Sequence, residues 1–234
     1  MNTTMLLPPL DEGILIQRVK RFLANIRLNS GQAITAHCPN SGSMLSCNIP
    51  GNPVLVSQSD KPGRLYRYTW EMILINNIWV GINTMVPNKV VFEAIIRKKI
   101  PGLEQYRTIK KEVPYGQNSR IDILLASDKE LCYIEIKNVS LVQDGIACFP
   151  DSVTARGTKH LHELIRMKQD GHRAIIFFFI QRSDHTLFRP AAHIDPEYAE
   201  TLSYAAARGV EIMVYQARVT PAEITLEKPI PFEL

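Results

Sequence analysis

The feature that most constrains the fold is a change in hydrophobic pattern at Pro87. Between residues 13 and 84, short apolar stretches alternate with turn-forming sequences such as Pro-Asn-Ser-Gly-Ser at 39–43 and Lys-Pro-Gly at 61–63. Stretches bounded by such turns are typical of an all-β domain. Residues 1–84 are therefore predicted to form a small β-barrel, and a barrel of about five strands is the shape of an oligonucleotide/oligosaccharide-binding (OB) fold.

Beyond Pro87, helical and strand patterns alternate. Residues 89–100 carry apolar side chains at helical spacing until Pro101-Gly102, and a second helix is expected within 153–168. A third helix should begin with Asp195 as N-cap and Pro196 in its first turn, and end before Gly209. Strands are predicted at 108–113, 120–126, 132–139, 174–180 and 209–219. The strand at 174–180 is wholly apolar, which implies a sheet covered on both faces, so residues 85–234 are predicted to form an α/β domain.

Length and composition fit a protein that folds without disulfides. A chain of 234 residues buries an adequate core. The four cysteines lack metal-ligand spacing and are expected to be reduced, mostly buried thiols: Cys38, Cys47, Cys132 and Cys148. The N-terminal sequence lacks the basic region of a signal peptide, and the longest apolar run is too short to span a membrane. We expect a soluble cytoplasmic protein without a membrane partner.

The charge is mildly basic, with 27 Lys and Arg against 23 Asp and Glu and a net charge of +4. Basic residues cluster at 18–21, 61–67, 97–99 and 110–111. Such clusters are compatible with a polyanionic partner, and they are also usual on solvated protein faces. Composition therefore admits a nucleic-acid partner without selecting one.

Three charged residues form the pattern that carries chemistry. Alternation along residues 120–125 places Arg120 and Asp122 on one face of a strand, opposite apolar side chains. The same alternation places Glu135 and Lys137 together in the next strand. If the two strands form a hairpin, both carboxylates come within reach of one cation. The alternative is a ladder of salt bridges on an exposed sheet face.

The chemistry of this trio points to phosphodiesters. Two facing carboxylates repel each other unless a cation lies between them, and Mg²⁺ (or Mn²⁺) binds such oxygen ligands together with phosphate oxygens. Lys137 would then orient or deprotonate a water molecule, or stabilise the charge that develops at phosphorus. The pattern therefore predicts a PD-(D/E)xK nuclease-type site with Asp122 and Glu135 as metal ligands.

Longer ordered segments resemble the sugar fermentation stimulation protein A family. They are AHCPNSGSM (36–44), EVPYGQNSRIDILL (112–125), CYIEIKNVSL (132–141), FPDSVTARGTKHLHEL (149–164) and RGVEI (208–212). The resemblance implies an N-terminal OB-like domain followed by a PD-(D/E)xK nuclease-like domain. It also implies DNA binding without marked sequence specificity and a role in regulating sugar (maltose) utilisation genes. It assigns Asp122, Glu135 and Lys137 to the nuclease pattern but does not establish cleavage.

Further candidates in the second domain come from positions that such folds often use. The acid of the first helix would be Glu93, although Glu93 could equally pair with Arg97 on the surface. Glu112 is a second candidate acid. In the region of the second helix, four polar residues are candidates to face the phosphate: Asp151, Arg156, Lys159 and His160. Lys159 is preferred to His160 there, and the alternative is that both simply solvate a helix face.

Candidates in the first domain are turn residues and one aromatic segment. His37, Asn40, Ser41 and Ser43 would offer polar groups to a phosphate, or they simply build a turn. Tyr66, Tyr68 and Trp70 alternate beside Arg64 and would suit base stacking, or they belong to the core. Together with these, Arg120 and Arg156 complete the predicted nucleic-acid contacts.

Three functions stay open from the sequence. The chain could be a non-specific DNA-binding protein on a nuclease scaffold, an active metal-dependent DNA or RNA nuclease, or an oligosaccharide-binding module. The basic clusters in both halves argue against the last. No recognition helix or zinc finger is discernible, which argues against a sequence-reading repressor.

Overall fold

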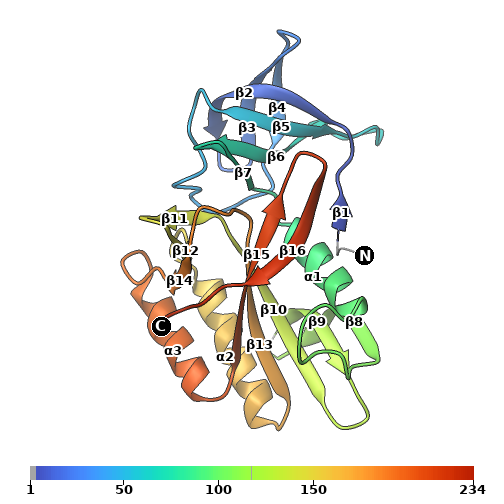
Figure 1. Cartoon of the computed structure of the whole chain (residues 1–234), viewed down its shortest axis with the longest axis vertical. Coiled ribbons are helices and arrows are strands. Elements are labelled where there is room, and N and C mark those ends of the chain that lie inside the picture. Colours follow the sequence, from blue (N-terminus) through green and yellow to red (C-terminus); the bar gives the residue numbers. More distant parts are fainter. Residues whose placement is uncertain (1–3, 117) are drawn as a thin grey trace.

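The computed structural model describes residues 4–116 and 118–234 and contains two bodies, a β-barrel above an α/β domain (Figure 1). The barrel strands are β2 (Leu10–Val19), β3 (Leu23–Leu28), β4 (Ala33–His37), β5 (Pro53–Gln58) and β6 (Tyr68–Ile75). Antiparallel pairing runs in the order β4-β3-β2-β5-β6, and a parallel pairing of β4 with β6 closes the barrel. A short strand, β7 (Ile78–Gly81), pairs with the far side of β6. The OB-like barrel predicted from the turns is confirmed.

Trp70 lies at the centre of the barrel core rather than on a ligand-facing surface. Its side chain is fully buried and its indole N–H donates to the carbonyl of Met72 at 2.8 Å. Tyr68 is half-buried against the same core. Tyr66 precedes β6, which begins at Tyr68, so it does not share a strand face with the other two rings. The predicted aromatic face for base stacking therefore does not form, because the interior of the barrel takes up the indole.

The second domain is built on a mixed sheet. Within the described ranges it has seven strands in the order β1 (Thr4–Leu6), β16 (Glu223–Pro229), β15 (Glu211–Val219), β13 (Arg173–Ile180), β10 (Leu131–Val139), β9 (Ser119–Ala126) and β8 (Thr108–Tyr115). The central strands β10, β13 and β15 are parallel, and the outer pairings are antiparallel. A small sheet is formed by β11 (Leu141–Gln143), β12 (Ile146–Phe149) and β14 (Leu187–Pro190).

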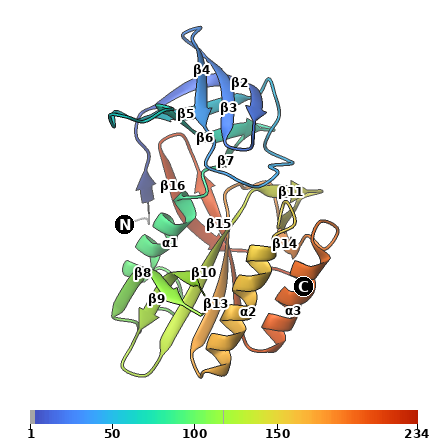
Figure 2. The same cartoon turned by 180° about the vertical axis from the view of Figure 1, so that it is seen from behind.

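Helices cover both faces of the large sheet, as the apolar strand predicted. On one face, α1 (Val86–Ile96) packs its apolar residues with Phe177 and Phe179 of β13. On the other, α2 (Ala155–Gln169) and α3 (Pro196–Ala207) lie side by side and pack against Phe178 (Figure 2). Alternate residues of one strand thus enter two separate cores, which explains why the whole stretch is apolar. The α/β class is confirmed.

Local signals placed the later helices well and the first one less well. The Asp195 carboxylate accepts the N–H of Tyr198 at 3.0 Å at the start of α3, and Gly209 has a φ of +87° after its end. Residues 89–100 were predicted as the first helix, whereas α1 begins at Val86 and ends at Ile96. Pro87 lies in the first turn of α1, where a proline is tolerated, so it does not precede the helix.

The first described strand belongs to the second domain. β1 lies within the range predicted for the barrel, yet it pairs with β16 at the edge of the large sheet (Figure 1). Neither β16 nor the strands of the small sheet were predicted, because their sequences are short or polar. All four cysteines lie within the described ranges and are free and buried, as predicted. Among the described helices, none has the length and apolar character needed to cross a membrane.

Contacts between the two bodies fix a barrel loop beside the second domain. The Asp151 carboxylate accepts the N–H of Met44 at 2.8 Å, and the Ser43 hydroxyl donates to the carbonyl of Asp151. The buried Arg182 donates to the Ser46 hydroxyl at 2.9 Å and to the carbonyl of Ser140 at 2.8 Å. The 40–46 loop therefore forms one wall of the space described next.

Candidate functional site

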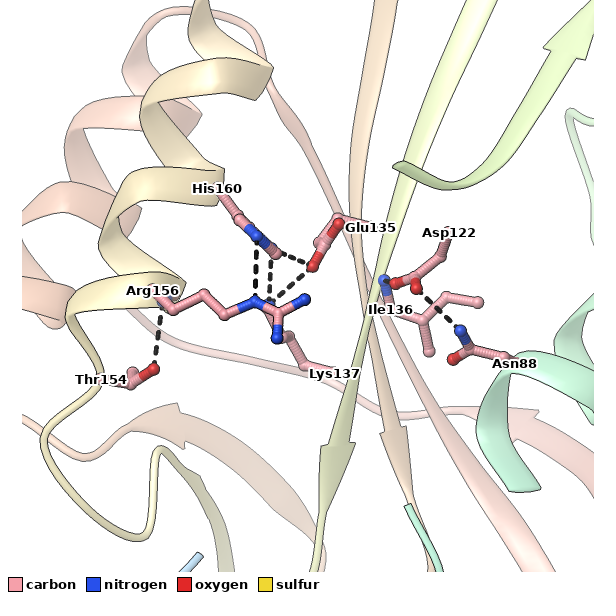
Figure 3. Close-up of polar contacts among 9 residues, drawn as sticks. Asn88, Asp122, Glu135, Ile136, Lys137, Thr154, Arg156 and His160 are labelled. Atoms are coloured by element: carbon pink, nitrogen blue, oxygen red, sulfur yellow. Dashed lines mark hydrogen bonds and ion pairs between the residues drawn. The ribbon is translucent and has the colours of Figure 1, made fainter. Parts of the chain in front are cut away.

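The candidate site lies at a fork in the large sheet, the point where β9 and β10 separate. Their regular pairing ends with Ile123 opposite Ile134, and the next residues on the two strands are Asp122 and Glu135. Asp122 Oδ2 accepts a hydrogen bond from the N–H of Ile136 at 2.7 Å, and Oδ1 accepts one from the side-chain amide of Asn88 in α1 at 2.7 Å (Figure 3). A side-chain carboxylate thus replaces the partner strand as acceptor, and this fixes Asp122 beside Glu135.

Glu135 is buried and asymmetrically bound. Its Oε1 accepts from the ammonium group of Lys137 at 2.8 Å and also contacts Nδ1 of His160 (Figure 3). Its Oε2 is buried and has no hydrogen-bond partner among the described residues. A buried carboxylate oxygen without a partner is costly, so this atom marks a place where a further group can bind.

The two carboxylates have opposite pKa shifts. Burial, and next the charge of Glu135, raise the pKa of Asp122 to about 6. Burial by itself raises the pKa of Glu135, but the charge of Lys137 and the hydrogen bond and charge of His160 outweigh it and lower that pKa overall. Glu135 is therefore ionised, and ionisation of Asp122 beside it is disfavoured. A cation between the two would remove that penalty.

A polar cavity of about 470 Å³ opens in front of the trio. Residues of both domains line it, among them Arg21, Asn40 and Ser41 of the barrel. Arg156 at the start of α2 lines this cavity and also a second hollow of about 740 Å³ on the β8–β9 side. Asp122, Glu135 and His160 line both, so the two carboxylates are reached from two sides, whereas Lys137 lines the first cavity.

The structure gathers many of the predicted site residues. The first cavity is lined by several of the predicted residues, with Gly42 and Asp151 beside them: Asp122, Glu135, Lys137, Asn40, Ser41 and Arg156. Glu112, Arg120 and Lys159 line the second hollow. Glu112 has a φ of +53° within β8, opposite the fork, and its carbonyl accepts from the Arg120 guanidinium at 3.0 Å. Strained backbone of this kind is frequent at functional sites.

Other predicted residues lie elsewhere. Glu93 lines neither cavity; it pairs with Arg97 at 3.7 Å and its side chain is 49% exposed, so the surface reading is correct. Asn88, almost a turn and a half earlier on α1, takes the place next to Asp122. His37, Arg64 and Tyr66 also line neither cavity. The Arg64 guanidinium instead donates to the Thr69 hydroxyl at 2.6 Å.

The structure brings His160, rather than the preferred Lys159, into contact with the trio, while the choice of Lys159 to face the phosphate stays a prediction. Lys159 is exposed, whereas His160 is buried and contacts the trio. A signal for this was present in the sequence, because His160 lies four residues before Leu164 and thus on the apolar side of the helix. The contact of Asn88 with Asp122 was not predicted, and no local sequence pattern indicates it.

The family models match both parts of the chain. The model described as "Sugar fermentation stimulation protein RE domain" matches residues 85–223, and the "SfsA N-terminal OB domain" matches residues 16–82. The chain belongs to the sugar fermentation stimulation protein family. The resemblance seen in the sequence motifs is thereby confirmed.

Relatives of this family cover nearly the whole chain. The sugar fermentation stimulation protein homolog of Geotalea daltonii is 52% identical over 226 residues, which cover 97% of this chain and 98% of the relative. That of Geobacter sulfurreducens is 49% identical over 228 residues, 97% of this chain and 98% of the relative. The solved structure of Pyrococcus furiosus SfsA in complex with Ca²⁺ superposes with a TM-score of 0.91 at 30% identity and covers 100% of both chains.

The residues at the fork suit a hard divalent cation. They offer two kinds of oxygen ligand: Oε2 of Glu135, which has no partner among the described residues, and the carboxylate of Asp122. In the part of the chain that is described, no group of three or more His, Cys, Asp or Glu side chains is placed to hold a metal ion. The protein would thus supply two carboxylates, and water or substrate oxygens the remaining positions. That division is usual for Mg²⁺.

Proposed function

We propose that this protein binds DNA without marked sequence specificity and hydrolyses its phosphodiester bonds with the help of Mg²⁺ or Mn²⁺. The observation that carries the proposal is the fork itself. Asp122, with its pKa raised to about 6, lies beside the buried Glu135, whose Oε2 has no partner among the described residues, and Lys137 is 2.8 Å from the other oxygen. Two acids and one lysine in this arrangement are suited to a phosphoryl group.

Asp122 and Glu135 would hold the divalent cation. When bound, the cation would polarise a phosphoryl oxygen and make a coordinated water more acidic. The calcium complex of the Pyrococcus furiosus protein supports a divalent cation in this family, since its fold and chain length match throughout. Hydrogen bonds from Asn88 and from the N–H of Ile136 orient the Asp122 carboxylate before any ligand arrives. Such preorganisation lowers the cost of binding.

Lys137 would act on the substrate side of the site. Its ammonium group has three protons, and one is donated to Glu135. The side chain is 12% exposed and lines the cavity, so the remaining protons can reach a water molecule or a phosphate oxygen there. Lys137 would orient the attacking water and stabilise negative charge that develops on the phosphoryl oxygens.

Arginines and helix α2 would position the nucleic acid. Arg21 from the barrel and Arg156 from the first turn of α2 line the cavity, and Asn40 and Ser41 add amide and hydroxyl groups. Contacts of this kind reach phosphates and carry no base sequence. Binding should therefore be non-specific and should weaken steeply as salt rises. A role in regulating sugar (maltose) utilisation genes would then rest on this DNA binding.

The test is incubation of the purified protein with single-stranded and duplex DNA in Mg²⁺ or Mn²⁺, with an EDTA control. Wild-type protein should cut DNA, whereas Asp122→Ala and Lys137→Ala should not. Asp128→Ala serves as matched control, because Asp128 is an exposed acid that pairs only at the surface with Arg107.

The other outcomes separate the competing functions. Salt-sensitive DNA binding without cutting, equal in wild type and both variants, would refute hydrolysis and leave a DNA-binding protein. Absence of DNA binding together with salt-insensitive binding of an oligosaccharide would refute the nucleic-acid proposal altogether.

A further inference from the structure

His160 contacts three charged side chains of the site. It is not a member of the predicted trio of Asp122, Glu135 and Lys137. The ring is 5% exposed and lies on the side of α2 that faces the sheet. Its Nδ1 contacts Oε1 of Glu135 and lies 3.3 Å from the Lys137 nitrogen, and its Nε2 lies 3.4 Å from Nε of Arg156 (Figure 3). The ring therefore bridges Arg156 at the cavity wall and the carboxylate at the fork.

The donors around the ring determine which nitrogen carries the proton. The guanidinium of Arg156 can only donate, so Nε2 of His160 must accept. In the neutral ring the proton is then on Nδ1, which donates to Oε1 of Glu135. Lys137 also donates to Oε1 of Glu135. Its nitrogen therefore lies close to Nδ1 of His160 because both groups donate to the same oxygen.

The consequence falls on the two oxygens of Glu135. Oε1 receives two donors, which occupy both of its lone-pair directions. Oε2 receives none from the described residues and is buried. The carboxylate is thus held in one rotation, with one oxygen saturated and the other left for a ligand.

We infer that His160 is a positioning residue that holds Glu135 with Oε2 toward the cation, and that Arg156 sets the ring tautomer needed for this. The inference rests on the cation site proposed above. It gives α2 a second task, because the same helix that presents Arg156 to the cavity also orients a ligand on the sheet. Thr154 anchors the start of this helix, since its hydroxyl accepts the N–H of Gly157 at 3.1 Å.

The test uses two amides that mimic different ring nitrogens. The side-chain nitrogen of His160→Asn reaches about as far as Nδ1 and keeps the donor to Glu135, whereas that of His160→Gln reaches as far as Nε2 and loses it. Ca²⁺ binding to the metal-free full chain is measured by titration calorimetry. We expect His160→Gln to bind Ca²⁺ about 10–100-fold more weakly than wild type, the usual effect of losing such an outer hydrogen bond, and His160→Asn to retain most of the affinity.

The matched control is His162→Gln, because His162 is an exposed histidine on the same helix. It should bind Ca²⁺ like wild type. If wild type binds Ca²⁺ and His160→Gln binds it equally well, the positioning role is refuted while the cation site stands. If His160→Asn loses as much as His160→Gln, a role in packing replaces the one inferred. If wild type binds no Ca²⁺, the cation site and this inference both fail.

A spectroscopic measurement on wild-type protein avoids any misfolded variant. Long-range ¹⁵N–¹H spectra of the metal-free protein distinguish the two neutral ring forms. We expect the His160 ring to carry its proton on Nδ1. A proton on Nε2 would overturn the inference, because Arg156 could not then donate to the ring.

Discussion

Replacement of Asp122 by asparagine should make the metal-free protein more stable at neutral pH. Asp122 lies in a buried place beside ionised Glu135, and burial followed by that charge raises its pKa from 3.8 to about 6. An amide at this position removes the charge and keeps the contacts. Its oxygen can accept the N–H of Ile136, and its nitrogen can donate to the Asn88 side chain once that amide turns over.

The size and pH dependence follow from the shift. A tenfold change in acidity corresponds to about 1.36 kcal/mol, so ionised Asp122 costs the fold about 3 kcal/mol at pH 7. Between pH 4 and 6 the folded protein keeps a proton that the unfolded chain loses, so wild-type stability falls as pH rises through this window. The advantage of Asp122→Asn should therefore be about 3 kcal/mol at pH 7 and below about 1 kcal/mol at pH 4.

Urea unfolding in EDTA at both pH values measures this difference. Asp128→Asn is the control, because its 88% exposed side chain should leave stability unchanged at either pH. If Asp122→Asn is less stable than wild type at pH 7, or if its advantage is the same at pH 4, burial and repulsion do not determine the effect of Asp122 on stability. Addition of Ca²⁺ should stabilise wild type alone, since the variant lacks a ligand.

Three further results are expected. Lys137→Met leaves ionised Glu135 buried without its ion pair and should lower the free energy of unfolding by about 3–5 kcal/mol. Adding Glu135→Gln should restore most of this loss, and additive losses in a double-mutant cycle measured by urea unfolding would contradict the expectation. Asp151→Ala removes the acceptor for the Met44 N–H and should cost about 1.5–3 kcal/mol in the same assay, whereas an unchanged value would show that this link between domains is dispensable. A hundredfold excess of Ca²⁺ over its Kd should stabilise wild type by about 2.7 kcal/mol in thermal unfolding, and no shift would argue against the cation site.

Local sequence accounts for much of the fold and for the central trio. Asp195 and Gly209 bound α3 because a cap acts through its own backbone neighbours. Asp122 and Glu135 could be paired from the sequence because they lie on adjacent strands joined by a short turn. Alternation then places their side chains without knowledge of the rest of the molecule.

The surroundings of the trio depended on contacts between distant segments. Trp70 has an aromatic side chain that could stack on a base, but closure of the barrel by β4 and β6 places its indole in the core. β1 joins the large sheet only because β16 offers it an edge more than two hundred residues later. Asn88 reaches Asp122 because α1 packs against the large sheet next to Asp122.

The sequence by itself determined the two-part architecture and the identity of the three charged residues, because periodicity, caps and turns act over a few neighbouring residues. The tertiary structure decided which side chains surround them. His160 rather than Lys159 meets Glu135, and the 40–46 loop meets Asp151, because helix rotation and domain contact are set by packing across the whole chain. A pattern of short range cannot specify contacts that join residues far apart in the sequence.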